Sequence, residues 1–164
     1  MSAVTPAELA RVNAELGRDA AGLTRWALGL GKNAIVTTNF RPFEAVILHL
    51  VTRVQPDMPV VWMDNGYNTE ATYRYADEVT RRLGLNLKTY LPLRTRAHRE
   101  AVEGPTPALD DPRHESFTQE VKLEPFARAL REQAPQVWFT ALRASDSAVR
   151  AQMEPVSINP DGLI

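Results

Sequence analysis

The sequence predicts an α/β fold of three layers, in which a mostly parallel sheet carries helices on both faces. From residue 33 onward, short β-branched and apolar runs alternate with segments of helical periodicity. The connections between them are short, as they are where a helix links one parallel strand to the next. The chain has 164 residues, 44% of them hydrophobic, which is enough to bury the core of one domain.

A pair of helices is expected before the sheet, as an N-terminal extension over residues 1–32 that acts as a lid or a brace. Thr5 stands before a proline with Glu8 at the capping spacing, the pattern of a helix N-terminus, and Gly17 ends the segment. A first helix is therefore predicted over 6–16. Apolar residues at the spacing of one helical face predict a second helix: Leu23, Trp26, Ala27 and Leu30.

Strands and helices alternate through the remaining domain, residues 33–164. Short apolar runs are predicted as strands at 33–38, 59–63, 85–91 and 136–142, with a further strand beginning at 156–158. Helices are predicted at 42–54, 70–83, 124–133 and 145–152. Residues 92–119 mix proline, glycine and charge without a sustained period, so a mobile loop or an active-site flap is expected there.

Composition and charge exclude several classes of function. The formal net charge of −1 balances 19 basic and 20 acidic side chains, so neither nucleic acid nor a membrane is expected as a partner. No run approaches the roughly 18 apolar residues of a membrane span, and the N-terminus lacks a signal-peptide pattern, so we expect a cytoplasmic protein. The chain contains no cysteine, so it supplies no disulfide, no thiolate ligand and no thiol nucleophile.

Polar side chains follow the predicted strands, at the edge where parallel sheets bind ligands. They are Thr37, Thr38 and Asn39 after the first strand, Asp64, Gly66 and Tyr67 after the second, Lys122 before the helix at 124, and Arg143, Ser147 and Arg150 after the fourth. The two arginines could converge on an anion. The alternative for this turn is a solvated surface, and the alternative for Asp64 is a simple turn in which it caps the next helix.

A metal site is not expected. His98, His114, Asp110 and Asp111 contain suitable donor atoms, but they fall in the irregular segment without the short regular spacing of metal ligands. No cofactor is expected either.

Four segments resemble the phosphoadenosine phosphosulfate (PAPS) reductase family in order and spacing. They are TTNFRPFEAVILHLV, VVWMDNGYNTEATYRYADEVTRRLGLNLKTY, VKLEPFARAL and VWFTALRASDSAVRAQMEPV. The resemblance implies a Rossmann-like adenine nucleotide α-hydrolase fold, related to the PP-loop ATP pyrophosphatases. It also implies the thioredoxin-dependent reduction of adenosine 3′-phosphate 5′-phosphosulfate to sulfite in sulfate assimilation. The expected ligands are this sulfonucleotide and adenosine 3′,5′-bisphosphate.

The resemblance assigns roles to the residues at the strand ends. The loop at 37–39 matches the serine-rich loop near the 5′-phosphosulfate, and 64–67 matches an Asp-Thr-Gly-Tyr segment beside the adenosine, with Asn65 in place of the threonine. Lys122 matches the basic residue of a Lys-x-Glu-Pro segment. The residues that match the family's anion clamp are Arg143, Ser147 and Arg150.

Three residues of the first loop depart from the family pattern. Arg41 stands at a glycine and is a further candidate for nucleotide binding, Phe43 stands at a polar position, and Glu44 stands at a small residue. A carboxylate there suits the helix dipole but repels a bound phosphate. We therefore expect Arg41 and Glu44 to pair at the helix start and to fill part of the place of the phosphosulfate.

The catalytic cysteine of the family has no counterpart in the sequence. Family members continue to a C-terminal Glu-Cys-Gly-Leu/Ile-His segment, whose cysteine attacks the sulfur, whereas this sequence ends in SINPDGLI. Serine and threonine cannot replace the thiolate, so the chain alone is expected to be inactive, and thioredoxin is expected as a partner only of a longer form. Without cysteine pairs, the iron–sulfur branch of adenosine phosphosulfate reductases is also disfavoured.

Three interpretations therefore remain open. The first is a PAPS reductase-like domain that binds the sulfonucleotide, either as a natural short relative or as part of a longer reductase. The second is a non-catalytic adenine-nucleotide sensor or protein-interaction module. The third and weakest is a PP-loop ATP pyrophosphatase, because the Ser-Gly-Gly-x-Asp-Ser loop is absent from the sequence. A homodimer is left open.

Overall fold

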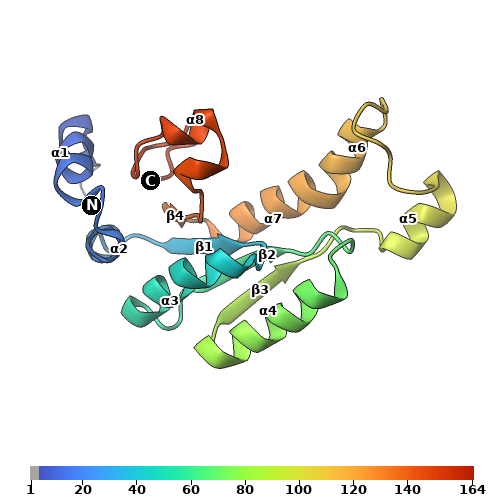
Figure 1. Ribbon diagram of the computed structural model, residues 1–164, viewed down its shortest axis with the longest axis horizontal. Coiled ribbons are helices and arrows are strands. Elements are labelled where there is room, and N and C mark those ends of the chain that lie inside the picture. The colour runs from blue at the N-terminus through green and yellow to red at the C-terminus, as the bar shows by residue number, and fades with distance from the viewer. Residues whose placement is uncertain (1–3) are drawn as a thin grey trace.

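The protein is built on one sheet of four parallel strands, and the computed structural model describes residues 4–164. The spatial order of the strands is β3-β2-β1-β4 (Figure 1). Their bounds are Ala34–Thr38 for β1, Pro59–Met63 for β2, Asn86–Tyr90 for β3 and Val137–Phe139 for β4. The chain therefore moves outward from β1 to β3 and then returns to the other side of β1. The point where strand order reverses, between β1 and β4, is where such sheets open a crevice for ligands.

Helices cover both faces of the sheet, which confirms the predicted fold class. On one face lie α3 (Ala45–Val54), preceded by the 3₁₀ turn η1 (Pro42–Glu44), and α4 (Glu70–Leu83), while α7 (Glu124–Gln133) lies on the other (Figure 1). Side chains alternate between the faces along each strand, so two cores form. The first includes Val36, Val60, Trp62, Leu48 and Val79, and the second includes Ile35, Val61 and Ala129.

The two N-terminal helices tie the beginning of the described chain to its end. They are α1 (Pro6–Leu16) and α2 (Ala20–Gly29), as predicted. The side chain of Asn13 on α1 donates to the carbonyl of Val156 at 2.8 Å and accepts from its N–H at 2.9 Å. Ala27 of α2 belongs to the first core. These contacts favour a brace over a lid, although residues 1–3 of the predicted extension lie outside the described residues.

The prediction of an irregular segment at 92–119 is only partly right, because residues 104–113 are irregular but helices lie on either side of them. This part of the chain forms α5 (Arg96–Glu103) and α6 (His114–Thr118), and α6 continues through a π-helical turn, η2 (Gln119–Leu123), into α7. These helices were not predicted because their buried side is formed by a cluster of charged side chains rather than by apolar residues at helical spacing. Arg94 donates to both carboxylate oxygens of Glu120 at 2.6 Å, while Arg99 of α5 is 3% exposed and stacks on Phe117 at 4.4 Å.

The predicted fifth strand is also wrong. Residues 156–158 are not a strand, and the predicted helix at 145–152 is divided into the 3₁₀ turn η3 (Ala144–Asp146) and the short helix α8 (Ala148–Ala151). The edge of β4 is instead met by Ile164. Its N–H donates to the carbonyl of Gln136 at 3.1 Å, and its carbonyl accepts from the N–H of Trp138 at 2.8 Å.

The helices of the described chain are all too short or too polar to cross a membrane.

Candidate functional site

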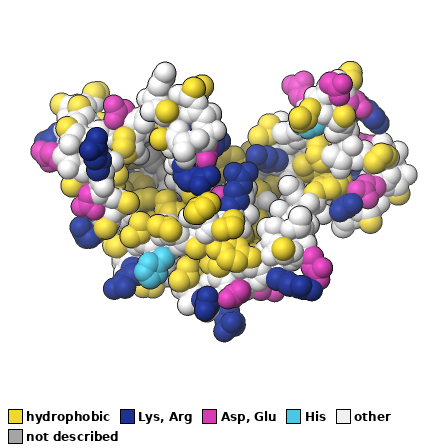
Figure 2. Space-filling model, viewed as in Figure 1, with side chains coloured by type: hydrophobic (Ala, Val, Ile, Leu, Met, Phe, Trp, Pro, Cys, Tyr) yellow, Lys and Arg dark blue, Asp and Glu magenta, His cyan; other side chains and the backbone are white. Residues whose placement is uncertain are grey.

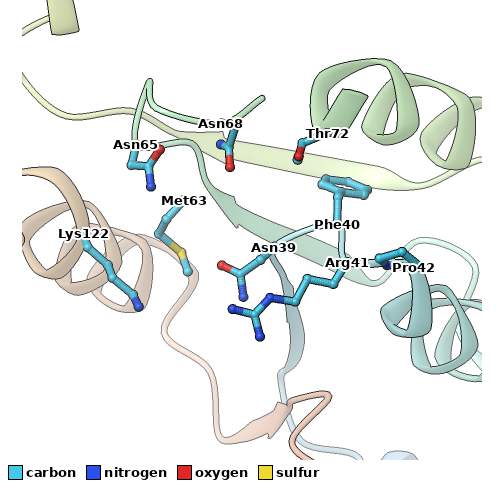
Figure 3. A pocket seen from close by; sticks show the side chains of 9 residues that line it. All are labelled: Asn39, Phe40, Arg41, Pro42, Met63, Asn65, Asn68, Thr72 and Lys122. Carbon is cyan, nitrogen blue, oxygen red and sulfur yellow. The ribbon is translucent and has the colours of Figure 1, made fainter. Parts of the chain in front are cut away.

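A cavity of about 350 Å³ opens at the carboxyl ends of β1 and β2 (Figure 3). It is formed by the loop after β1, the loop after β2, the first turns of α4 and the π-helical turn before α7. Most of its lining is amide or cationic, and three of the predicted site residues belong to it. The lining residues are Asn39, Phe40, Arg41, Pro42, Met63, Asn65, Asn68, Thr72 and Lys122.

The carboxylate of Glu44 occupies the interior of the loop after β1. Its Oε2 accepts hydrogen bonds from the hydroxyl of Thr38 at 2.8 Å, from the N–H of Asn39 at 2.6 Å and from the N–H of Arg41 at 3.3 Å. The Thr38 hydroxyl in turn accepts from the N–H of Phe40, whose φ of 54° completes the sharp turn. Donors of the kind that hold phosphate are thus bound to a carboxylate of the chain itself.

The predicted side-chain pair between Arg41 and Glu44 does not form, and the expectation that the two fill part of the place of the phosphosulfate stays a prediction. Glu44 turns inward and is 8% exposed. Within residues 4–164, however, Arg41 forms no ion pair with it and gives it only a backbone N–H. The Arg41 side chain extends instead into the cavity, beside Asn39 (Figure 3). Its backbone is extended (φ −74°, ψ 150°), the conformation favoured before a proline such as Pro42.

Thr37 lies on the opposite face of the sheet from Thr38. Residues alternate along β1, so the Thr37 side chain turns toward the layer of α7. There its hydroxyl accepts from the indole N–H of Trp138 at 2.9 Å. Thr37 therefore joins β1 to β4 rather than contributing its side chain to the cavity.

Asp64 organises the loop after β2. This carboxylate is 9% exposed, and its Oδ1 accepts from the N–H of Gly66 at 3.0 Å, from the amide of Asn68 at 2.9 Å and from the hydroxyl of Tyr73 at 2.8 Å. Burial raises the pKa of the Tyr73 hydroxyl, and the hydrogen bond to Asp64 and its negative charge raise it further. The alternative in which Asp64 caps the next helix is wrong, because Thr69 caps α4.

Gly66 and Tyr67 hold the loop after β2 against α5 and α6. Gly66 has a φ of +78°, which favours glycine at this turn. The ring of Tyr67 packs edge-on against Phe117, with ring centres 5.4 Å apart, and lies under the guanidinium of Arg96 at 4.8 Å. These contacts leave Asn65 and Asn68 as the side chains that this loop presents to the cavity.

The arginines after β4 converge on the carboxylate of Asp146, and their predicted contact with a ligand anion stays a prediction. Arg143 donates to one of its oxygens at 2.8 Å and Arg150 to the other at 3.0 Å. Burial acts to raise the pKa of Asp146, but the hydrogen bond from Arg143 and the charges of both arginines outweigh it and lower the pKa. Arg143 also lies 4.8 Å above the ring of Phe43, and Ser147 caps α8 through the N–H of Arg150.

Lys122 reaches the cavity from the π-helical turn. Such a turn inserts one residue into the helical repeat and re-aims the side chains around it. In the part of the chain that the structure describes, the exposed Lys122 side chain makes neither a hydrogen bond nor an ion pair. Figure 3 shows it directed toward the same space as Arg41.

Several residues in and around the site escaped the sequence analysis. Asn68 and Thr72 flank the Thr69 cap of α4, and their only signal is the four-residue spacing across a helix start. Asp146 had a stronger signal, because it lies at helical spacing from both Arg143 and Arg150. Over residues 4–164, no group of three or more His, Cys, Asp or Glu side chains is arranged to hold a metal ion.

Residues 33–162 match the phosphoadenosine phosphosulfate reductase domain. The chain belongs to this family. It is 39% identical over 166 residues to the phosphoadenosine 5′-phosphosulfate reductase of Synechococcus sp., covering 98% of this chain and 70% of that protein. It is 42% identical to the enzyme of that name from Xanthomonas euvesicatoria over 147 residues, covering 88% and 61%, and 40% identical to the one from Escherichia coli over 152 residues, covering 92% and 62%.

A solved structure supports the fold independently. The crystal structure of PAPS reductase from Candida auris, in a phosphate complex, superposes with a TM-score of 0.74 at 21% identity, covering 87% of this chain and 70% of that one. The three sequence relatives above are also longer, since this chain spans 61% to 70% of their lengths. The PAPS reductase resemblance expected from the sequence is thus confirmed, and the cavity lies within the matched region.

Proposed function

We propose that this PAPS reductase-family domain binds an adenine sulfonucleotide in the cavity at the ends of β1 and β2. The observation that carries the proposal is the pairing of two cations, Arg41 and Lys122, with the amides of Asn39, Asn65 and Asn68 around one cavity. Cations suit phosphate and sulfate groups, and amides suit the polar edges of a nucleoside. The volume of about 350 Å³ falls in the range of small-molecule sites.

The local charge of this face supports the proposal. Although the net charge of the chain is −1, Lys and Arg side chains gather in the middle of the face shown in Figure 2. Such a local concentration of basic groups attracts an anionic ligand without giving the protein a general affinity for polyanions. The Candida auris relative was solved as a phosphate complex, which is consistent with an anion site in this fold.

The family reaction is the reduction of the sulfonucleotide to sulfite, and we propose that these 164 residues supply its nucleotide-binding part. They contain no cysteine, so the thiol that attacks the sulfur must come from outside them. Thioredoxin is proposed as a partner only where that cysteine is present. With thioredoxin and reductant supplied, the purified chain should release no more sulfite from PAPS than a protein-free control does.

We assign the predicted site residues to two roles. Asn39, Arg41 and Lys122 are proposed to contact the nucleotide, because they line the cavity. Thr38, Asp64 and Gly66 shape the loops around it. The remaining ligand contacts stay predictions: Thr37, Tyr67, Arg143, Ser147 and Arg150. For the two arginines, such a contact requires the ligand to replace Asp146.

Calorimetric titration with adenosine 3′,5′-bisphosphate tests the proposal, with adenosine as the matched uncharged probe. Measurable heat and a ligand-induced rise in melting temperature are expected for the bisphosphate, and much weaker binding for adenosine. If neither probe binds at millimolar concentration, the nucleotide-binding function is wrong. The interaction-module alternative, which the inward-turned Glu44 also favours, would then replace it.

A further inference from the structure

We propose that the anionic group of the ligand is held by Arg41 and Lys122, and that Glu44 excludes it from the backbone donors of the loop after β1. The inference rests on the proposed function, because it names the residues that select the ligand of the same cavity. It makes Arg41 and Glu44 determinants of specificity: one attracts the phosphate or sulfate ester of a nucleoside, and the other prevents its entry into the loop.

The loop donors are already engaged by Glu44. One oxygen, Oε2, accepts from the Thr38 hydroxyl and from the N–H groups of Asn39 and Arg41. A phosphate or sulfate that used the same donors would lie next to this buried carboxylate, and two negative charges in contact repel strongly where water is excluded. The loop can therefore receive an external anion only after Glu44 leaves.

The arginines after β4 are engaged in the same manner. Arg143 and Arg150 bind the two oxygens of Asp146, so their charge is largely balanced. Other cations near this edge of the sheet also have carboxylate partners: Arg94 and Arg99 with Glu103 and Glu120, Arg96 with Glu100, and Arg128 with Glu124. Among the cavity-lining residues of the described chain, Arg41 and Lys122 are the cations, and neither forms an ion pair.

The geometry of Arg41 suits recognition of an anion. Its backbone is fixed on one side by Pro42 and on the other by the N–H bond to Glu44, so its side chain starts toward the cavity. Figure 3 shows its guanidinium beside Asn39, with Lys122 directed to the same space from the opposite wall. A guanidinium presents two parallel N–H donors to the oxygens of a phosphate or sulfate, while an ammonium adds a point charge.

Four variants of the full chain test the inference by calorimetry with adenosine 3′,5′-bisphosphate. Arg41→Ala should weaken binding by about tenfold to a hundredfold, as expected for a charge-assisted bond, and leave adenosine binding unchanged. Arg81→Ala is the matched control, because Arg81 is exposed in the last turn of α4, whereas the cavity lies at the first turn of that helix. Glu44→Ala should strengthen bisphosphate binding. Glu44→Gln, which can still accept from the loop N–H groups, should strengthen it less and guards against a destabilised loop.

The outcomes separate this inference from the proposed function. If the bisphosphate binds but Arg41→Ala leaves its affinity unchanged, or if both Glu44 variants weaken binding, the inference is wrong and the function stands. If inorganic sulfate binds through Arg41 but the nucleotide binds no better than sulfate, the assignment of Arg41 to the anion stands and the nucleotide function is wrong. If the unmodified chain binds neither sulfate nor the bisphosphate, both are wrong.

Discussion

The loop after β1 and the segment after β4 both bind a carboxylate of the chain with donors suited to an anion, but the donors differ. Both follow neighbouring parallel strands, both gather anion donors, and in both a carboxylate of the chain accepts from those donors. In the first, the donors are mainly backbone N–H groups fixed by the turn, and the acceptor, Glu44, is buried. In the second, they are guanidinium groups on side chains that are 51% and 38% exposed.

This difference indicates which of the two carboxylates a ligand can displace. Exposed ion pairs contribute little to stability because water screens them and flexible side chains lose entropy on pairing. A ligand could therefore take the place of Asp146 at small cost. Displacing Glu44 would leave two N–H groups and a hydroxyl without their acceptor, which costs far more. We infer that the first loop is closed by donors of its backbone and the second only by exposed side chains.

Of the variants that test this comparison, Glu44→Ala should have the largest effect on stability. The substitution leaves three donors without their buried acceptor, so it should lower the free energy of unfolding by about 2–3 kcal/mol. The melting temperature should fall on the order of 5–10 °C in a thermal melt. Glu70→Ala is the control, because Glu70 forms an exposed pair with Arg74 at the start of α4 and should change stability little. Equal shifts for both variants would contradict the account of the loop.

Thr38→Val tests the same loop from the strand side. Its hydroxyl donates to Glu44 and accepts from the N–H of Phe40, so the variant loses two hydrogen bonds with little change in volume. We expect a loss of about 1–2 kcal/mol in denaturant unfolding. Thr38→Ser keeps the hydroxyl and should recover most of this loss. If the serine variant is no more stable than the valine variant, the hydroxyl does not support the turn.

Much of the fold could be predicted from apolar periodicity. The predictions failed where a segment is held by charged side chains or by backbone groups instead. The bounds of β2, α4 and α7 match their predictions, because each buries apolar residues at regular spacing. The helix α5 does not follow this rule, since its buried residue is Arg99, which is paired with carboxylates from other turns. Backbone groups of Ile164 form hydrogen bonds to the edge of β4, and no pattern of side chains in the sequence predicts that contact.

The candidate site could be predicted only in part, for a similar reason. Asn39, Arg41 and Lys122 follow from motif positions and do line the cavity. Asn68 could not be found in this manner, because its place depends on a hydrogen bond to Asp64 within a folded loop. The resemblance placed Arg143 at an anion site without showing that Asp146 already serves as the anion.

The smallest expected effect is that of Asp146→Asn, and it should depend on pH. The pKa of Asp146 is lowered in the folded chain, so its ionised form stabilises the protein at a pH above the unfolded value of about 3.9, and this contribution is lost as the pH falls through the folded pKa. The difference in melting temperature between the unmodified chain and the variant should be small near neutral pH and should shrink further as the pH falls below the unfolded pKa of the carboxyl group. A difference that grows on acidification would show that the arginines do not hold the ionised carboxylate.

The central claim is that the cavity binds a nucleotide whose anionic group stays outside the loop after β1, and a crystal structure with adenosine 3′,5′-bisphosphate tests it most directly. The account predicts a phosphate group between Arg41 and Lys122, with the Glu44 carboxylate still accepting from the N–H of Asn39. A phosphate bound to the N–H groups of the loop, with Glu44 turned out to solvent, would contradict it.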